Sequence, residues 1–220
     1  MKVMILAAGR GQRMGHLTDE LPKPMLPVAG KPLIERLIER LADTGLTQLV
    51  INIAWQGDII RDHFSDGHRW GVQIRWSDEG HSPIGTASGI RRALPLLGQQ
   101  PFLLINSDVI CDVDFRRFAE YPLQASRAHL LMVDNPDHHP QGDFDVDEGR
   151  LVCAGGERLT YSGIGLFEPA LIAHSTDAAL GPIIRTAIER GDSITARHHR
   201  GQWLDVGTPE RLRLAQTDLS

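Results

Sequence analysis

Runs of almost uninterrupted apolar residues alternate with segments of helical spacing in the first half of the chain, and this alternation restricts the fold more than any other feature. The apolar runs occupy residues 3–8, 49–54 and 102–105. Because polar and apolar residues do not alternate within them, they are typical of strands covered on both faces of a sheet. Residues 32–44 carry apolar side chains at intervals of three and four, which predicts an amphipathic helix. Strand and helix repeated in this order predict an α/β fold with a mostly parallel sheet.

Weaker patterns predict the remaining elements. Further strands are expected at residues 72–76, 128–133, 143–146, 151–154 and 163–167, and a last one ending near Asp205. Further helices are expected at residues 58–64, 86–97 and 180–190, and after Thr208 and Pro209, which suit an N-cap and a first turn. No internal repeat, low-complexity segment or linker interrupts the chain, so we expect one domain over residues 1–220.

Composition excludes several classes of function. The chain has 220 residues and a net charge of −5, and no block of Lys and Arg stands out, which argues against nucleic acid or an anionic membrane as partner. No run approaches the roughly 20 apolar residues of a membrane span. Cys111 and Cys153 lie far apart without metal-ligand spacing, so two thiols in a reducing compartment are favoured over a disulfide. Residues 3–8 are too short for a signal peptide, and we expect a cytoplasmic protein.

A glycine-rich turn follows the first predicted strand, with the sequence Leu-Ala-Ala-Gly-Arg-Gly-Gln-Arg-Met over residues 6–14. Such a turn lets backbone N–H groups approach a phosphate at the carboxyl edge of a parallel sheet. It is not a dinucleotide fingerprint, because Met14 stands where the last glycine would be, and no Gly-Lys-Ser/Thr follows as in a Walker loop. On its own the turn could equally be a structural loop.

Two cations strengthen the phosphate-binding interpretation. Arg13 lies in the same turn, and Lys23 lies between Pro22 and Pro24. The two prolines restrict the backbone around the lysine, which a merely solvated lysine does not need.

Two aspartates follow strands that are far apart in the sequence. Asp108 ends the run Asn106-Ser107-Asp108, and Asp205 lies in Trp-Leu-Asp-Val-Gly-Thr over residues 203–208. Magnesium prefers oxygen ligands and often uses one or two carboxylates together with phosphate oxygens and water. Either aspartate alone could instead be a helix cap or a turn residue.

The motifs of residues 6–14, 17–18 and 22–24 together resemble the signature of sugar-1-phosphate nucleotidylyltransferases, and the resemblance extends over nearly the whole chain. It implies a single-domain, Rossmann-like α/β/α sandwich with a mixed, mostly parallel central sheet, whose residues 1–110 hold the nucleotide and residues 111–220 the sugar. It also implies an enzyme in which Arg13 and Lys23 contact the reacting phosphates, while Asp108 and Asp205 hold Mg²⁺. The nucleotide-binding residues that the resemblance implies are Leu6, Ala7, Ala8, Gly9, Gly11, Glu79, Gly85 and Thr86. For the last three, an ordinary N-cap and helix start is the alternative.

Residues 134–144 resemble one subfamily, the short N-acetylmuramate-1-phosphate uridylyltransferases of peptidoglycan recycling, and residues 161–164 and 199–203 are similar to it as well. The resemblance implies UTP and N-acetylmuramic acid α-1-phosphate as substrates. The sugar-binding residues that it implies are Asn106, Gly142, Asp143, Ser162 and Gly163. N-acetylglucosamine 1-phosphate, mannose 1-phosphate with GTP, and phosphocholine with CTP stay open as alternatives. A non-catalytic nucleotide-sugar-binding subunit is another, although it would be expected to lose Arg13, Lys23 or one aspartate.

The lactyl group of N-acetylmuramic acid is anionic, and this bears on Asp143 and Asp145. The two alternate along a predicted strand and would share a face. Since two carboxylates would repel the lactyl group, we expect both to face away from it, with His138, His139 or Arg200 supplying favourable charge or hydrogen bonds.

Overall fold

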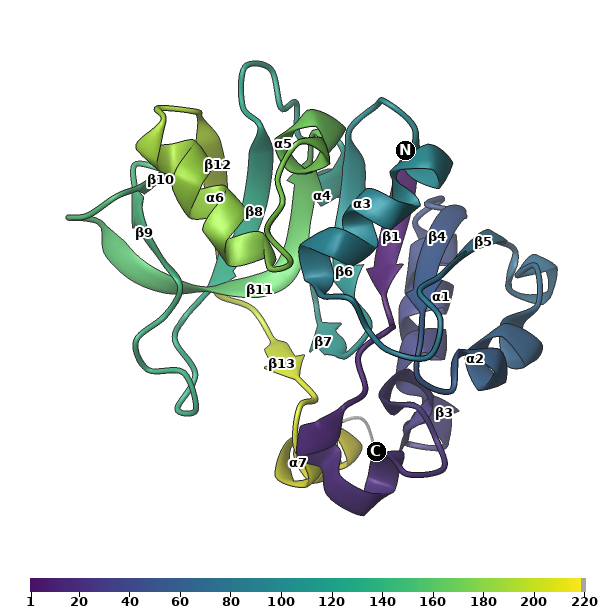
Figure 1. The fold of residues 1–220 in the computed structure, drawn as a ribbon. Coiled ribbons are helices and arrows are strands. Elements are labelled where there is room, and N and C mark those ends of the chain that lie inside the picture. The colour runs from purple at the N-terminus through teal and green to yellow at the C-terminus, as the bar shows by residue number, and fades with distance from the viewer. Residues whose placement is uncertain (219–220) are drawn as a thin grey trace.

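One mixed sheet of nine strands forms the centre of the computed structural model, which describes residues 1–218 (Figure 1). The strands lie in the order β5-β4-β1-β6-β11-β8-β12-β10-β9. Their bounds are β1 Lys2–Leu6, β4 Gln48–Ile53, β5 Gln73–Asp78, β6 Phe102–Asn106, β8 Ala128–Val133, β9 Phe144–Asp147, β10 Arg150–Val152, β11 Glu157–Phe167 and β12 Ile194–His199.

The first half of this sheet is parallel, as the apolar runs predicted. β4 and β6 pair with β1 on its two sides, and β5 pairs with β4, all in the parallel sense. The chain therefore builds outward from β1 through β4 and β5, then returns to place β6 on the other side of β1. Such a reversal leaves a crevice at the carboxyl ends of the two strands, where open α/β sheets bind their ligands.

The second half of the sheet is mixed. β11 pairs antiparallel with β6 and β8, β12 pairs parallel with β8, and β9 and β10 form an antiparallel hairpin. The predicted mostly parallel sheet therefore holds for the first half alone. The predicted strand at residues 163–167 is the end of the longer β11, whose pairing with β8 is irregular between Tyr161 and Gly165. β12 was not predicted as a separate strand.

Helices cover both faces of the sheet and give an α/β/α arrangement. They are α1 Leu33–Asp43, α2 Gly57–Phe64, α3 Thr86–Leu97, α4 Phe115–Ala119, α5 Pro169–Ala173 and α6 Leu180–Glu189. Alternate residues of β1 point to opposite faces. Val3 and Ile5 lie in a core with side chains of α1, α2 and α4, while Met4 lies in a second core with side chains of α3, α5 and α6.

Short elements complete the fold and were mostly missed, because they are too short to show a periodic pattern. They are the 3₁₀ helices η1 Gln12–Thr18, η2 Lys23–Met25 and η3 His68–Trp70, the ladder of β2 Pro27–Val28 with β3 Lys31–Pro32, and the ladder of β7 Val109–Cys111 with β13 Trp203–Asp205. Two of the later elements were predicted, the strand β13, which ends at Asp205, and the last helix, α7 Pro209–Asp218.

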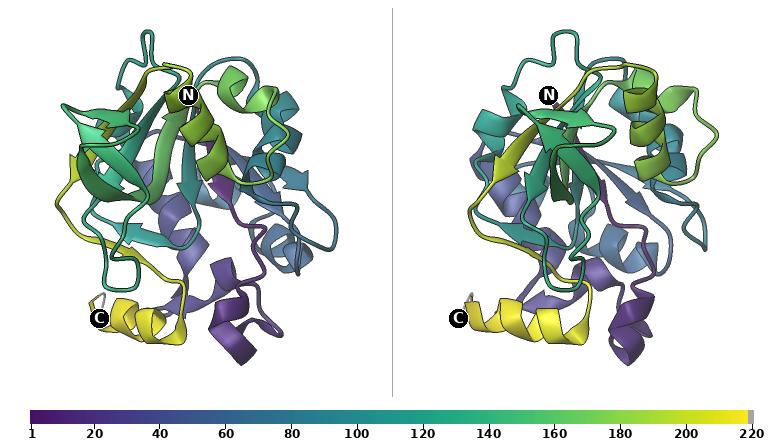
Figure 2. Two further views of the ribbon diagram at one scale, coloured as in Figure 1. Left: turned by 60° about the vertical axis from the view of Figure 1, so that its left-hand side comes forward. Right: turned by 90° about the vertical axis from the view of Figure 1, so that its left-hand side faces the viewer.

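Helix α7 packs beside η1, so the end of the chain lies next to the glycine-rich turn (Figure 2). A small third core joins them through Met14, Leu212 and Ala215. This contact between distant parts of the chain places α7 close to the candidate site.

Both cysteines are free thiols, as their separation predicted. Cys111 is buried and Cys153 is exposed. Among the described residues, none of the helices combines the length and the apolar character that crossing a membrane requires.

Candidate active site

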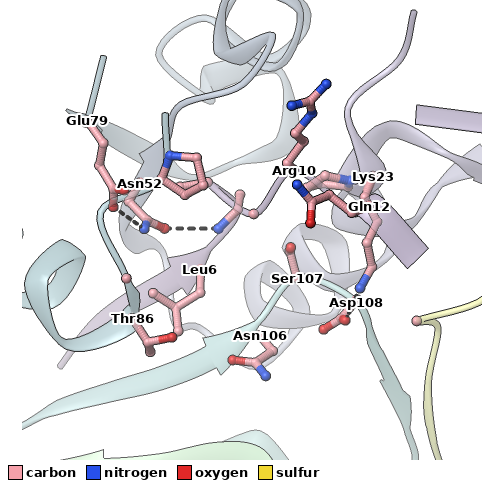
Figure 3. A pocket seen from close by; sticks show the side chains of 18 of the residues that line it. Leu6, Arg10, Gln12, Lys23, Asn52, Glu79, Thr86, Asn106, Ser107 and Asp108 are labelled. Atoms are coloured by element: carbon pink, nitrogen blue, oxygen red, sulfur yellow. Dashed lines mark hydrogen bonds and ion pairs between the residues drawn. The ribbon is translucent and has the colours of Figure 1, made fainter. Parts of the chain in front are cut away.

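A cavity of about 750 Å³ lies at the carboxyl ends of the parallel strands (Figure 3). All of the predicted nucleotide-binding residues line it, together with the two predicted phosphate-binding cations, one predicted sugar-binding residue, Asn106, and one predicted metal ligand, Asp108. These are Leu6, Ala7, Ala8, Gly9, Gly11, Arg13, Lys23, Glu79, Gly85, Thr86, Asn106 and Asp108. Lining residues that were not assigned from the sequence are Arg10, Gln12, Pro24, Asn52, Ser82, Pro83, Ser107 and Gly207.

The glycine-rich turn takes its shape from Gly11. This residue has φ 69°, in the left-handed region that favours glycine, and stands as the N-cap of η1. A Cβ there would meet the Lys23 Cβ at 2.9 Å. The missing side chain thus allows the turn and the Lys23 segment to approach, which brings the two predicted cationic segments onto one cavity.

A buried polar network, missed from the sequence, fixes the turn against the segment after β5. Asn52 Oδ1 accepts the Ala7 N–H at 2.9 Å, and Asn52 Nδ2 donates to Glu79 Oε1 at 2.7 Å (Figure 3). Glu79 Oε2 accepts the Ile84 N–H at 3.0 Å. The available signal was Asn52 itself, a polar residue near the end of an apolar strand that would be costly to bury without partners.

The two predicted metal-binding aspartates are neighbours in the structure. Asp205 stands opposite Val109 in the β7–β13 ladder, and the Val206 N–H donates to the Asp108 carbonyl at 2.8 Å. Each carboxylate also contacts a cation. The Lys23 ammonium pairs with Asp108, and Arg211 Nη1 lies 2.6 Å from Asp205 Oδ1.

Burial raises the pKa of the Asp205 carboxyl, and the negative charge of Asp108 acts in the same direction, while Arg211 and His138 oppose it. Burial also lowers the pKa of His138, whose Nε2 lies 3.3 Å from Asp205 Oδ1. The carboxylates of Asp108 and Asp205 repel each other, and the charges of Lys23 and Arg211 counteract this repulsion.

A second cavity of about 300 Å³ adjoins the first. Its predicted lining residues are Arg13, Asn106, Asp108, Asp143, Ser162, Gly163 and Asp205, together with His138 and His139, which were predicted to serve the lactyl group; the residues not assigned from the sequence are Val109, Thr160, Tyr161 and Trp203. Arg13, Asn106 and Asp108 line both cavities. A ligand in each cavity would therefore meet the other beside a cation and a carboxylate.

Asp143, a predicted sugar-binding residue, lines the second cavity. That it faces away from the lactyl group of the sugar stays a prediction. Asp143 precedes β9, so strand alternation does not govern it. Its carboxylate accepts the Tyr161 N–H at 2.8 Å and lies 3.2 Å from His139 Nε2. Asp145, by contrast, pairs with Arg158 at 2.9 Å. Arg200 lies in neither lining.

Gly142 is the predicted sugar-binding residue that lines neither cavity. It has φ 59°, and a Cβ there would meet Asn135 Oδ1 and the Leu159 carbonyl carbon and oxygen at no more than 3.0 Å. Its place in the structure is explained by the tight turn that leads into Asp143.

Comparison with known proteins agrees with this geometry. The model of the nucleotidyl transferase family matches residues 2–148. The chain belongs to the nucleotidyl transferase family. It is 46% identical to the N-acetylmuramate alpha-1-phosphate uridylyltransferase of Neisseria meningitidis serogroup B, over 98% of this chain and 97% of that protein.

Other nucleotidyl transferases are more distant. Mannose-1-phosphate guanyltransferase beta-A of Xenopus laevis is 26% identical over 96% of this chain, which spans 62% of that protein. The crystal structure of HddC from Yersinia pseudotuberculosis complexed with GMP-PN superposes with a TM-score of 0.80 at 23% identity, covering 100% of this chain and 99% of that one. At that identity the likeness concerns the fold. The chain is thus a nucleotidyltransferase enzyme with an α/β fold.

Proposed function

We propose that this nucleotidyltransferase transfers the uridylyl group of UTP to N-acetylmuramic acid α-1-phosphate, giving UDP-N-acetylmuramic acid and pyrophosphate. The observation that carries the proposal is the meeting of two cavities at Arg13, Asn106 and Asp108. A nucleotide in one and a sugar phosphate in the other would place their phosphates side by side. The N-acetylmuramate alpha-1-phosphate uridylyltransferase of Neisseria meningitidis, which is similar to this chain over nearly its whole length, supports the choice of base and sugar.

The larger cavity suits the nucleotide, and residues 1–110 supply most of its lining. Its glycine-rich turn offers backbone N–H groups to the triphosphate, and the wall near Glu79 and Gly85 offers space for a base. The smaller cavity suits the acceptor, and residues 111–220 supply most of its lining. We propose this division of labour within one domain.

The transfer is an in-line displacement. An oxygen of the sugar 1-phosphate attacks the α-phosphorus of UTP, the bond to the oxygen that bridges to the β-phosphate breaks, and pyrophosphate leaves. The attacking oxygen is already anionic, so no general base is required. Arg13 and Lys23 stabilise negative charge on the transferring and leaving phosphates, and the two cavities hold the reactants in line.

The residues present fit a magnesium ion. Asp108 and Asp205 offer hard oxygen donors. Burial, with the charge of Asp108 adding to it, raises the pKa of Asp205, and a divalent cation would favour its ionised form. Residues 1–218 hold no group of three or more His, Cys, Asp or Glu side chains that could form a protein cage. Two carboxylates with phosphate oxygens suit magnesium. When bound, the ion supplies charge neutralisation at the reacting phosphates.

The charge balance of the second cavity bears on the sugar. Asp143 would repel the lactyl carboxylate. His139, however, is half-exposed in the cavity, and its Nε2 lies 3.2 Å from Asp143 Oδ1. We propose that His139, by engaging the Asp143 carboxylate, and His138, by offering a hydrogen bond, let the cavity accept an anionic substituent. The resemblance of residues 134–144 to enzymes of peptidoglycan recycling supports a cytoplasmic role in that process.

Pyrophosphate release tests the proposal. The purified enzyme is assayed with four nucleoside triphosphates against N-acetylmuramic acid, N-acetylglucosamine, mannose and glucose 1-phosphates and phosphocholine. We expect the highest kcat/KM for UTP with N-acetylmuramic acid α-1-phosphate. A higher value for another sugar would overturn the choice of substrate but keep the transfer reaction, whereas no release with any pair would overturn both.

A further inference from the structure

Arg211 on α7 is buried against residues of the second cavity, although it was not singled out from the sequence. Its side chain is 10% exposed, and its Nη1 lies 2.6 Å from Asp205 Oδ1. The same nitrogen contacts His138 Nε2. Asp205 and His138 both line the second cavity, so one guanidinium bridges a residue of β13 and a residue of the 134–143 loop.

The backbone between Asp205 and α7 is built around this guanidinium. An added Cβ at Gly207 would collide with Arg211 Nη2, and it would lie 3.3 Å from Arg13 Nη2. Glycine at this position lets Arg211 lie across the segment that carries Asp205. The Arg211 Nε is buried without a hydrogen-bond partner among the described protein atoms, and the guanidinium contacts Asp205 and His138 through Nη1.

We propose that Arg211 is a positioning residue for the transfer reaction, holding Asp205 and His138 in place and making helix α7 part of the active site. The proposal rests on the proposed function. Since Arg211 engages Oδ1 of Asp205, the other carboxylate oxygen stays available to a cation. Groups that hydrogen-bond a metal-binding side chain fix its orientation, and their loss commonly weakens metal affinity or activity by about 10–100-fold.

The contact with His138 extends this role to the acceptor. A guanidinium has five N–H donors in a fixed planar fork and no acceptor, so it can hold two neighbouring groups at set positions. A lysine ammonium on the same stem is a point charge without this fork. Arg211 itself lines neither cavity, but both of its partners, Asp205 and His138, line the second cavity and not the nucleotide cavity, so its removal should affect metal and acceptor more than UTP.

The test compares Arg211→Ala and Arg211→Lys with Arg213→Ala. Arg213 lies on the same helix, is exposed, and pairs with the exposed Glu210 at 3.4 Å. Mn²⁺ affinity is measured by electron paramagnetic resonance in the presence of a non-hydrolysable UTP analogue, and KM is measured separately for UTP and for the acceptor. Thermal unfolding shows that each variant is folded at the assay temperature.

For Arg211→Ala we expect Mn²⁺ affinity to fall by about 10-fold or more, with a similar rise in the acceptor KM and a UTP KM within about twofold of the wild type. Arg211→Lys should recover only part of the loss, because the donors of an ammonium rotate freely and are not fixed in the plane of a guanidinium. If Arg211→Ala does not fold, Arg211→Lys carries the comparison and should still bind Mn²⁺ more weakly than Arg213→Ala.

The inference is overturned if the Arg211 variants match Arg213→Ala in Mn²⁺ affinity and acceptor KM, or if only their unfolding temperature changes. Failure of the proposed function looks different, because the wild type would then release no pyrophosphate with any substrate pair. Mn²⁺ affinity does not depend on turnover and would still compare the variants.

Discussion

The Val206 N–H donates a hydrogen bond to the Asp108 carbonyl at 2.8 Å. With Asp205 opposite Val109 in the β7–β13 ladder, this bond sets two carboxylates from distant strands side by side at the junction of two cavities. Because backbone hydrogen bonds position Asp108 and Asp205, conservative substitutions of these two side chains should alter the chemistry while leaving the fold intact.

Metal dependence follows from this pair. Asp108→Asn and Asp205→Asn should each fold normally and lose activity by about 100-fold or more, because a neutral amide is a poorer ligand for a hard cation. Chelation should abolish pyrophosphate release by the wild type, and added Mg²⁺ should restore it. Asp112→Asn is the matched control, since Asp112 pairs with His199 at 2.7 Å outside both linings. Full activity in excess chelator would disprove the two-aspartate site.

Arg13 and Lys23 should act mainly in the transition state. Truncation of either to alanine should lower kcat by on the order of 10²–10³, roughly 3–4 kcal/mol, as for loss of one preorganised electrostatic contact. Lys31→Ala is the control, because Lys31 pairs with Glu39 at 2.6 Å away from both cavities. A variant with wild-type kcat and only a raised KM would limit that residue to ground-state binding.

Glu79→Gln tests the buried network beside the nucleotide cavity. Both carboxylate oxygens accept hydrogen bonds, from Asn52 Nδ2 and the Ile84 N–H, so an amide NH₂ would face a donor. Loss of one such buried bond costs about 1–3 kcal/mol, so kcat/KM for UTP should fall by about 5–100-fold. Asp78→Asn, at an exposed neighbouring position, should leave UTP kinetics unchanged. Equal kinetics for Glu79→Gln and wild type would remove this network from nucleotide binding.

His129 should make stability depend on pH. Burial lowers its pKa from 6.5 to about 4, with Arg197 adding to the effect. Between these values the unfolded chain binds a proton that the folded chain does not, so stability is full above pH 6.5 and falls as the pH drops towards 4. At about 1.4 kcal/mol per pKa unit, the loss from this group is at most roughly 3 kcal/mol.

His129→Phe checks that assignment. The ring can keep its stack on Tyr121, where the centroids lie 3.6 Å apart, but it cannot titrate. Denaturant unfolding at several pH values should show a smaller loss of stability in acid for the variant than for wild type. Parallel curves for the two proteins would assign the acid sensitivity to other groups.

The parallel half of the sheet could be predicted because each of its strands is a local apolar run, and local patterns report burial directly. The mixed half resisted prediction for physical reasons. β12 ends in two polar residues, His198 and His199, so its sequence lacks the apolar pattern of a buried strand. Their side chains find partners only in the folded chain, in Asp134 and Asp112. The length of β11 depends on three partners, β6, β8 and β9, and on the irregularity near Tyr161 rather than on its own composition.

The residues of the site also fall into two groups, those that local sequence predicts and those that only the folded chain brings together. The sequence by itself determined the glycine-rich turn and the Lys23 segment, because turn geometry and prolines act over a few residues. Only the tertiary structure decided that Asp108 and Asp205 meet, that Asn52 holds Glu79, and that Arg211 reaches Asp205 and His138. An arginine on a short terminal helix looks solvent-exposed in sequence, because nothing local shows which distant carboxylate it will approach. That information lies in the packing of η1 against α7 and in the β7–β13 ladder, which form only when the whole chain has folded.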